Sequence, residues 1–262
     1  MTFTDTHCHI HESTYADPEG AYQRAMEAGV HRLVCVGTDS RSSLEAVTFA
    51  QTHENVRASV GLHPHDATSG IAAINELESL LQQDSQKKIV AIGECGLDYF
   101  YDNSPREQQI ETLHAQLRLA QKYHLPVIFH VRDSSSPDDI GSVWNDFWPI
   151  FDSYEGLRGV LHSFTDTLSN LKYGLSRGLL VGVNGIATFT KDNNQREMFA
   201  SIPVNRLLFE TDAPFLTPIP YRGNVNEPAF MTHIAQNIAN LQSISLEELS
   251  RATERNATTI FF

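Results

Sequence analysis

The sequence is poor in the residues that build disulfide-stapled or membrane-spanning proteins. It has three cysteines, Cys8, Cys35 and Cys95, with no Cys-x-x-Cys spacing. This odd number argues against a disulfide framework and fits a reducing compartment. No apolar run approaches the length of a membrane span, and polar residues interrupt the first apolar positions, so no signal peptide is expected. We therefore expect a cytoplasmic protein that has no membrane partner.

Basic residues are scarce too. The chain has 19 lysines and arginines against 32 acidic residues, which gives a net charge of −13. A protein that holds duplex DNA by charge neutralisation needs a basic surface, so tight clamping on long DNA is not expected. Two divalent cations in a pocket would reverse the local field, however, so this charge is compatible with a polyanionic substrate.

Two glycine-rich phosphate-binding motifs are missing as well. No Gly-x-Gly-x-x-Gly follows the first predicted strand, and the chain has no Gly-Lys-Ser/Thr loop. Both motifs belong to nucleotide-binding proteins with an open, doubly wound sheet. That architecture is the runner-up for this sequence, and it lacks support.

What the sequence does contain is a regular alternation of short apolar runs and helical stretches. Near-continuous apolar strands that alternate with helices are typical of a parallel sheet covered on both faces. Eight such units in 262 residues predict the α/β class and a (β/α)₈ TIM barrel, with residues 1–262 as a single domain. The expected strands lie near residues 3–9, 33–36, 56–62, 89–92, 126–129, 159–161, 179–184 and 207–209, and the expected helices near 18–29, 42–52, 71–83, 105–123, 137–154, 167–177, 195–201, 227–241 and 245–256.

Residues of metal-binding type stand at the ends of these apolar runs. His7 and His9 are two residues apart on one strand, so they project the same way and can reach one ion. A lone histidine or aspartate at a strand end is commonly structural, but a barrel brings the carboxyl ends of its strands together at one face. Six residues of this kind at one face are difficult to attribute to chance. The candidate metal ligands are His7, His9, Glu94, His130, His162 and Asp212.

Glu94 is the candidate for a shared ligand. A carboxylate that bridges two cations holds them about 3.5–4 Å apart in two-metal hydrolases. Its small neighbours, Gly93 and Cys95, are expected to let the metals approach the backbone. We assign His7, His9 and Asp212 to one ion and His130 and His162 to the other, with Glu94 shared.

Several motifs together form a specific signature along nearly the whole chain. They are Asp-Thr-His-Cys-His at 5–9, Gly-Leu-His-Pro-His at 61–65, Gly-Glu-Cys-Gly-Leu-Asp-Tyr at 93–99, His-Val-Arg-Asp at 130–133, His-Ser-Phe at 162–164 and Glu-Thr-Asp-Ala-Pro-Phe-Leu at 210–216. The sequence resembles the TatD family of metal-dependent deoxyribonucleases, part of the amidohydrolase-like superfamily. The resemblance implies a (β/α)₈ fold, a divalent metal pair on the six residues named above, and phosphodiester hydrolysis, commonly 3′–5′ removal of nucleotides from DNA.

The identity of the metal stays open between Mg²⁺, Mn²⁺ and Zn²⁺. Mixed imidazole and carboxylate ligands suit Zn²⁺, Mn²⁺ or Fe²⁺ on softness alone. The resemblance, in contrast, implies Mg²⁺.

The chain departs from the family pattern at two places. Asp166 stands where the family often has glycine, and the segment from Asp138 to Trp148 is longer and more acidic than usual. Both are expected in loops at the mouth of the barrel. They bear on substrate choice rather than on metal binding.

Other residues near the expected mouth are candidates for substrate binding. His63 follows the third strand, and either contacts phosphate or is a solvated residue next to Pro64. Arg132 and Arg222 match phosphate oxygens bidentately, although Arg132 equally suits a loop-ordering ion pair. Cys8 alternates to the opposite face from the two histidines and is expected to be a small buried hydrophobe.

The function hypothesis is a metal-dependent hydrolase that cleaves phosphodiester bonds. A metal-activated hydroxide attacks in line, Asp212 accepts its proton, and Glu94 and Asp212 are the catalytic carboxylates. The expected enzyme is a monomeric 3′–5′ exodeoxyribonuclease that acts on single-stranded or frayed DNA ends, with RNA as a further substrate. The alternatives are a small-molecule amide, lactone or phosphoester hydrolase of the same superfamily and, with less support, a metal-binding scaffold without activity.

Overall fold

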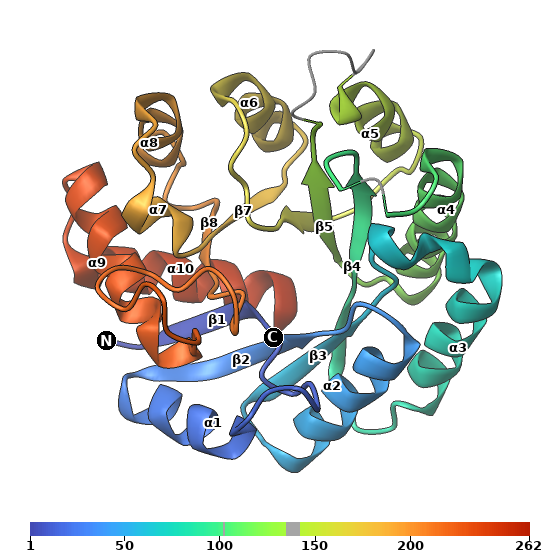
Figure 1. The fold of residues 1–262 in the computed structure, drawn as a ribbon, viewed down its shortest axis with the longest axis horizontal. Helices are drawn as coiled ribbons and strands as arrows, with labels where there is room; N and C mark the ends of the chain where they lie inside the picture. The colour runs from blue at the N-terminus through green and yellow to red at the C-terminus, as the bar shows by residue number, and fades with distance from the viewer. Residues whose placement is uncertain (102, 135–141) are drawn as a thin grey trace.

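Eight parallel strands form one sheet in the order β1 to β8, as a computed structural model of the chain shows (Figure 1). The structure describes residues 1–101, 103–134 and 142–262. In Figure 1 the strands ring a central axis and the helices surround them, which confirms the predicted (β/α)₈ barrel. The strands are β1 (Phe3–Cys8), β2 (Val30–Val36), β3 (Val56–Val60), β4 (Ile89–Asp98), β5 (Val127–Arg132), β6 (Gly159–Leu161), β7 (Leu180–Val183) and β8 (Leu207–Phe209).

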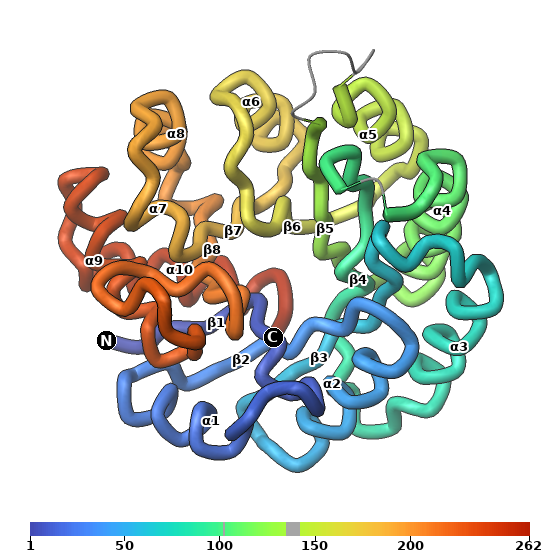
Figure 2. The backbone as a smooth tube through the Cα atoms, in the orientation of Figure 1, coloured from blue at the N-terminus to red at the C-terminus, as the bar shows by residue number. Residues whose placement is uncertain are grey.

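Helices follow the strands along the chain, and the smooth backbone trace shows α1 to α6 on the outside of the ring (Figure 2). The helices are α1 (Pro18–Glu27), α2 (Ser40–Thr52), α3 (Gly70–Gln83), α4 (Arg106–Tyr123), α5 (Val143–Asp152), α6 (Leu168–Ser176), α7 (Ile186–Phe189), α8 (Asn193–Ala200), α9 (Met231–Gln242) and α10 (Leu246–Phe261), with 3₁₀ turns η1 (Pro64–Ser69) and η2 (Pro228–Phe230). None of the helices in the described ranges is both long and apolar enough to cross a lipid bilayer.

The first and last strands meet through backbone and side-chain hydrogen bonds. The amide of Asp212 donates to the carbonyl of His7 at 2.9 Å, and the amide of His9 donates to Ala213 at 2.7 Å. Asp5, which is fully buried, accepts hydrogen bonds from the amide and the hydroxyl of Thr211. The junction therefore fixes the end of β1, where the predicted ligands His7 and His9 lie, beside the predicted ligand Asp212, which follows β8.

The barrel interior is filled by a separate apolar cluster. Inward-facing residues from β2, β4, β5, β6 and β8 pack against the last turns of α10. Because Glu254 of α10 accepts a hydrogen bond from Thr4 and pairs with Arg32 at 2.8 Å, near the start of β1 and β2, α10 covers the amino-terminal end of the barrel. The cluster comprises Val34, Val36, Ala91, Ile128, Val160, Leu208, Ala257, Ile260 and Phe261.

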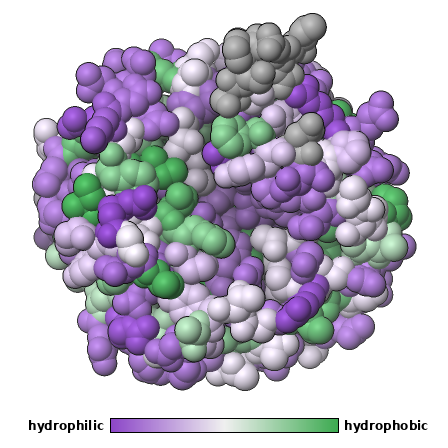
Figure 3. Space-filling view, viewed as in Figure 1, coloured by the Kyte–Doolittle hydropathy of each residue, from purple (hydrophilic) through white to green (hydrophobic). Residues whose placement is uncertain are grey.

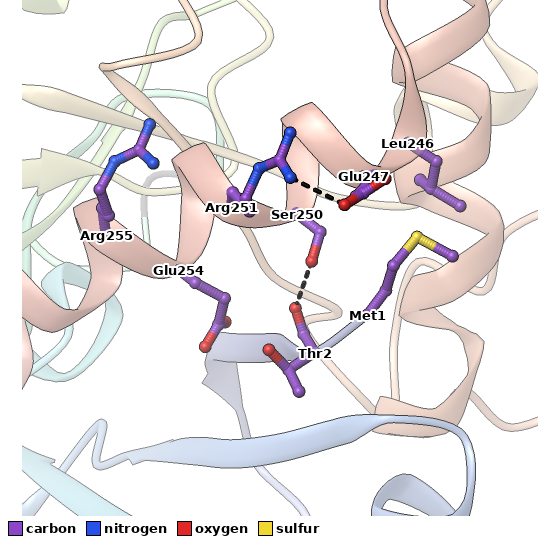
Figure 4. Close-up of a pocket in the computed structure, with 8 residues that line it drawn as sticks. All are labelled: Met1, Thr2, Leu246, Glu247, Ser250, Arg251, Glu254 and Arg255. Atoms are coloured by element: carbon purple, nitrogen blue, oxygen red, sulfur yellow. Dashed lines mark hydrogen bonds and ion pairs between the residues drawn. The ribbon is translucent and has the colours of Figure 1, made fainter.

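A cleft of about 770 Å³ lies at this same end, between the residues before β1 and α10 (Figure 4). Its walls are held by internal contacts: Ser250 donates to the carbonyl of Thr2, and Arg251 pairs with Glu247 at 2.7 Å. The predicted ligands lie at the opposite, carboxyl-terminal end of the barrel.

Several predicted boundaries were wrong, each for a local reason. The helix expected over 137–154 begins at Val143, because Ser142 is extended and its hydroxyl accepts the amide of Trp144; residues 137–141 lie outside the described residues. The helix expected from 227 is split, since the turn at Pro228–Phe230 precedes α9. The last helix continues to Phe261, whose burial against the barrel interior extends it beyond residue 256.

The role of α10 as a plug gives a stability prediction. Phe261→Ala removes a large side chain that is 4% exposed, and is expected to lower the free energy of unfolding by about 3–4 kcal/mol, because a cavity remains inside the barrel. Urea unfolding followed by circular dichroism measures the change. Thr259→Ala, on the exposed face of the same helix, is the control and should change stability by less than about 0.5 kcal/mol. Equal effects of the two substitutions would contradict the plug.

Candidate metal centre

The six predicted ligands meet at the carboxyl-terminal end of the barrel. A space-filling view of this face shows a central hollow with hydrophilic walls (Figure 3). The structure groups their donor atoms, together with those of His63, into three overlapping sets in which all atoms lie within 4.8 Å of one another. The sets are His7, His9 and Asp212; His7, Glu94 and His162; and His63, Glu94 and His130.

The first set agrees with the expected grouping. Nε2 of His7 lies 3.1 Å from Nε2 of His9, and the nearer oxygen of Asp212 lies 3.7 Å from the first and 3.4 Å from the second. Asp212 has a left-handed backbone conformation, with φ at 58°, which turns its carboxylate back towards β1 after β8 ends. Aspartate tolerates this conformation better than most residues.

The Glu94 carboxylate lies between the other histidines. Its Oε1 is 2.7 Å from Nδ1 of His130 and 3.8 Å from Nε2 of His162, while its Oε2 is 3.3 Å from Nε2 of His7. His162 is also 3.8 Å from Asp212, so it lies between the two carboxylates. The expected division placed His162 with His130; in the structure, His63 is the histidine that joins Glu94 and His130 in a close set.

Groups outside the cluster orient three of these imidazoles. Nδ1 of His9 lies 2.9 Å from the carbonyl of Val36, and Nε2 of His130 lies 2.8 Å from Oδ2 of Asp98. Nδ1 of His162 lies 3.0 Å from Oε2 of Glu210. Each contact fixes one ring nitrogen and directs the other towards the cluster, as the outer partners of metal-binding histidines commonly do.

The sequence analysis did not assign a role to Asp98 or Glu210. Asp98 was missed because the fourth strand was expected to end near residue 92, whereas β4 continues to Asp98. With that extension, Glu94 and Asp98 fall four residues apart on one face of the strand. Glu210 precedes Asp212 by two residues, so an acidic residue close to a predicted ligand was the available signal; its burial, at 1% exposed, is seen only in the structure.

The glycines near Glu94 have a packing role that the sequence did not indicate. A Cβ at Gly93 would lie 2.6 Å from the carbonyl oxygen of Ile128, and one at Gly96 would lie 1.8 Å from that of His130. Both φ angles, 137° and 155°, also disfavour a side chain. Gly93 and Gly96 therefore let β4 approach the backbone of β5 closely.

The donor set fits divalent cations. Glu94 is 4% exposed, and Asp98 and Glu210 are at most 1% exposed. Within the described ranges, the ion pairs of these carboxylates and of Asp212 are with histidines, and none is with lysine or arginine. Buried carboxylates need compensating positive charge, and imidazole nitrogens with carboxylate oxygens are the ligand types of Zn²⁺, Mn²⁺ and related ions.

The charges of the cluster follow from its carboxylates. Burial lowers the pKa of His130, but hydrogen bonds to Asp98 and Glu94 outweigh it and raise the pKa to about 9. Burial acts in the same direction on His162, whose pKa is nevertheless raised to about 10 by Glu210 and Glu94. Burial raises the pKa of Glu94, yet His162, His63 and His7 bring it well below its usual value. Without a metal, protons on His130 and His162 offset the charge of the carboxylates.

His63 is arranged as a hydrogen-bond donor. Its Nδ1 accepts the amide of His65 at 3.1 Å, so the neutral ring carries its proton on Nε2, which lies 3.5 Å from Glu94. Burial and the neighbouring His130 lower the pKa of His63 to about 4, which keeps the ring neutral. A protonated Nε2 suits a substrate oxygen better than it suits a metal.

The two candidate arginines lie outside the cluster, Arg132 at the end of β5 and Arg222 in the segment between β8 and η2. The guanidinium of Arg132 stacks 4.0 Å from the ring of Phe100, and that of Arg222 stacks 4.0 Å from the ring of Phe189. Arg222 also donates to the carbonyl of Thr217. In the described part of the chain no carboxylate forms an ion pair with Arg132, so the loop-ordering ion pair considered for it is not seen there.

The two departures from the family pattern are joined in space. The indole of Trp144 donates to Asp166 at 2.8 Å, which ties the start of α5 to the loop after β6. Residues 138–141 of the acidic segment lie outside the described residues. Cys8 is fully buried beside Val34, as expected for a residue on the outer face of β1.

The fold and this cluster together define a metal-dependent hydrolase built on a (β/α)₈ barrel. The sequence model of the TatD related DNase family matches residues 4–262. The chain therefore belongs to this family, as its motifs predicted.

Relatives support the same conclusion. The chain is 33% identical over 258 residues to YabD, an uncharacterized metal-dependent hydrolase of Bacillus subtilis (strain 168), with 98% of each chain covered. It is 34% identical over 243 residues to the 3′-5′ ssDNA/RNA exonuclease TatD of Escherichia coli (strain K12), with 90% of each covered. The crystal structure of YJJV, a TatD homolog from Escherichia coli K12, matches with a TM-score of 0.89 and 28% identity over 99% of this chain and 97% of that one.

The raised pKa values predict that metal binding releases protons. Without metal, His130 and His162 are protonated at neutral pH, because their pKa values are about 9 and about 10. A histidine must be neutral to bind a metal, so filling the site at neutral pH is expected to release about two protons, one from each, and affinity should rise with pH up to those values. Calorimetric titration with Mn²⁺ in buffers of different ionisation enthalpy measures the number.

His130→Gln serves as the matched variant, and should release about one proton fewer than the unmodified protein. An unchanged count, or a metal affinity that falls as the pH rises towards 9, would contradict the assignment.

Proposed function

We propose that this chain is a 3′–5′ exonuclease that removes nucleotides from the end of single-stranded DNA, and of RNA, with residues 1–262 acting as one catalytic domain. The observation that carries the proposal is the position of Glu94, whose buried carboxylate lies among four imidazoles and faces Asp212 at the open end of the barrel. The exonuclease among the relatives, named for ssDNA and RNA, supports the substrate class.

The residues proposed to hold two divalent cations are those predicted from the sequence. His7, His9 and Asp212 would hold one cation and His130 and His162 the other, with Glu94 shared between them. Bound cations supply positive charge for the phosphate oxygens and lower the pKa of water towards 7. The ion itself is proposed to be Mg²⁺, Mn²⁺ or Zn²⁺.

The side chains of the protein handle the proton and the phosphate. Asp212, placed by its left-handed backbone and by the bond from its amide to His7, accepts the proton of the attacking water. His63 is neutral and carries a proton on Nε2, so it donates to a phosphate oxygen without changing its charge. Arg132 and Arg222 lie on the rim, where their guanidinium groups reach phosphates of the bound strand.

The shape and charge of the site favour a strand end over a duplex. The cluster lies in a hollow at one end of a barrel rather than along an open groove, and the net charge is −13. A base must leave its stack before its phosphate can enter such a hollow, and a paired end has to spend unpairing energy first. A single-stranded or frayed end avoids that cost.

The exonuclease prediction is tested with linear and circular single strands. The purified protein with Mg²⁺, Mn²⁺ or Zn²⁺ is expected to release mononucleotides from a 5′-labelled linear oligonucleotide and to leave a circular strand of the same sequence intact. Asp212→Asn, which cannot accept the proton, should slow the reaction by at least about 100-fold. Cutting of the circle at a rate comparable to that of the linear strand would falsify the exonuclease assignment, and turnover only of a small chromogenic ester would favour the small-molecule alternative.

The shared role of Glu94 predicts different metal contents for two variants. Glu94→Ala is expected to lose most of both ions because its carboxylate contacts ligands of each set, whereas His162→Ala should lose mainly one. Elemental analysis of the dialysed proteins measures the ions per chain. Glu111→Ala, an exposed glutamate on α4, is the control and should keep the full content. Two ions retained in Glu94→Ala would rule out the bridging role.

A further inference from the structure

Two large aromatic side chains are exposed beside the metal centre. Phe100 is 40% exposed and Tyr101 is 53% exposed, directly after the end of β4. Their ring centroids are 4.9 Å apart and the rings are nearly perpendicular, at 79°, so they form two walls of a corner. Exposed neighbouring aromatic rings are unusual on a soluble surface, and flat faces of this kind are what single-stranded nucleic acid stacks on.

The backbone of this corner is held firmly. The amides of Phe100 and Tyr101 both donate to Oδ1 of Asp98 at 2.9 Å. Asp98 itself is fully buried, and its amide donates to the side chain of Gln109 at 2.8 Å. The rings are therefore presented by a rigid turn, and their exposure is a property of the fold.

The same carboxylate connects the corner with the metal centre. Oδ2 of Asp98 lies 2.8 Å from Nε2 of His130, a proposed metal ligand, and 3.1 Å from Nε2 of His65. The ring of Tyr101 packs edge-on against His65, with centroids 5.3 Å apart. One histidine thus separates Tyr101 from the cluster, because the His65 ring is also 6.1 Å from the ring of His130.

A cation completes the corner. The guanidinium carbon of Arg132 lies 4.0 Å from the centre of the Phe100 ring and 4.8 Å from that of Tyr101. No described carboxylate pairs with Arg132, so its charge is not neutralised by a residue in the described ranges. An arginine that is stacked on a ring is held in place yet keeps its N–H groups for a phosphate.

We propose that Phe100, Tyr101 and Arg132 form a base-binding subsite for the nucleotide that follows the cleaved one. A nucleobase stacks on the parts of the two rings that Arg132 leaves exposed, and Arg132 pairs with the phosphate of the same nucleotide. This inference rests on the proposed nuclease function and gives it a means of holding a strand without a basic groove. The subsite accepts any base, because every base has a flat face, and it rejects paired bases, whose faces are already stacked.

The experiment measures coupling between the rings and the base. Oligonucleotides of one sequence carry either a normal nucleotide or an abasic tetrahydrofuran unit at the penultimate 3′ position. Binding is measured by fluorescence anisotropy on the Asp212→Asn protein with Mn²⁺, and kcat/KM on the active protein. Phe100→Ala/Tyr101→Ala is expected to weaken binding of the normal strand by about 10-fold or more. The same change should have little effect on the abasic strand, from which the stacking partner has already been removed.

Two further variants separate stacking from structure. Tyr101→Phe keeps the ring and should bind the normal strand as tightly as the unmodified protein does. Tyr101→Leu keeps the apolar bulk without a ring face and should bind that strand more weakly. Tyr173→Ala is the matched control, since Tyr173 is 52% exposed on α6 with Arg177 5.7 Å from its ring, and it should bind as the unmodified protein does.

The outcomes are distinguishable. An equal loss on normal and abasic strands, or no loss on either, overturns the subsite, whatever the nuclease activity. Ring-dependent binding of the strand by a protein that cleaves no nucleic acid would support the subsite and overturn the proposed function. Absence of both binding and cleavage would overturn both.

Discussion

The structure of the candidate metal centre depends on the buried negative charge of Glu94. Among the described residues, the groups that pair with this carboxylate are imidazoles. The imidazoles of His7, His63, His130 and His162 lie around that carboxylate, and Asp98 and Glu210 contact His130 and His162 from outside. Because an uncompensated carboxylate inside a protein is costly, the cluster is stable only with protons or cations present. The need for positive charge is therefore built into the folded chain.

The sequence predicted the barrel and the six converging residues because both leave strong local signals. Apolar runs of strand length alternate with helices, and a histidine or a carboxylate directly after such a run marks the strand end that faces the mouth of the barrel. Asp98 and Glu210 could not be assigned in the same way, since an acidic residue next to a ligand looks alike whether it orients a histidine or faces solvent. The plugging of the barrel by α10 and the contact of Gly96 with β5 depend on packing between distant segments, which no local pattern records.

The net charge and the local contacts of the site have opposite effects on the binding of a polyanion. The surface carries a net charge of −13, so attraction at long range is weak or unfavourable. In the proposed function short-range contacts compensate: the cluster itself, the neutral donor of His63, and the two arginines that lie against aromatic rings. Such a protein should discriminate strongly by local geometry, because a ligand gains little until it reaches the hollow.

The junction of β1 with β8 has a consequence for how the protein is made. His7 and His9 leave the ribosome early, whereas Asp212 emerges only after more than two hundred further residues, and the bond from its amide to His7 forms later still. A nascent chain thus carries an incomplete set of ligands for most of its synthesis. The proposed ligand set is completed only late in biogenesis, and a chain interrupted before β8 lacks Asp212.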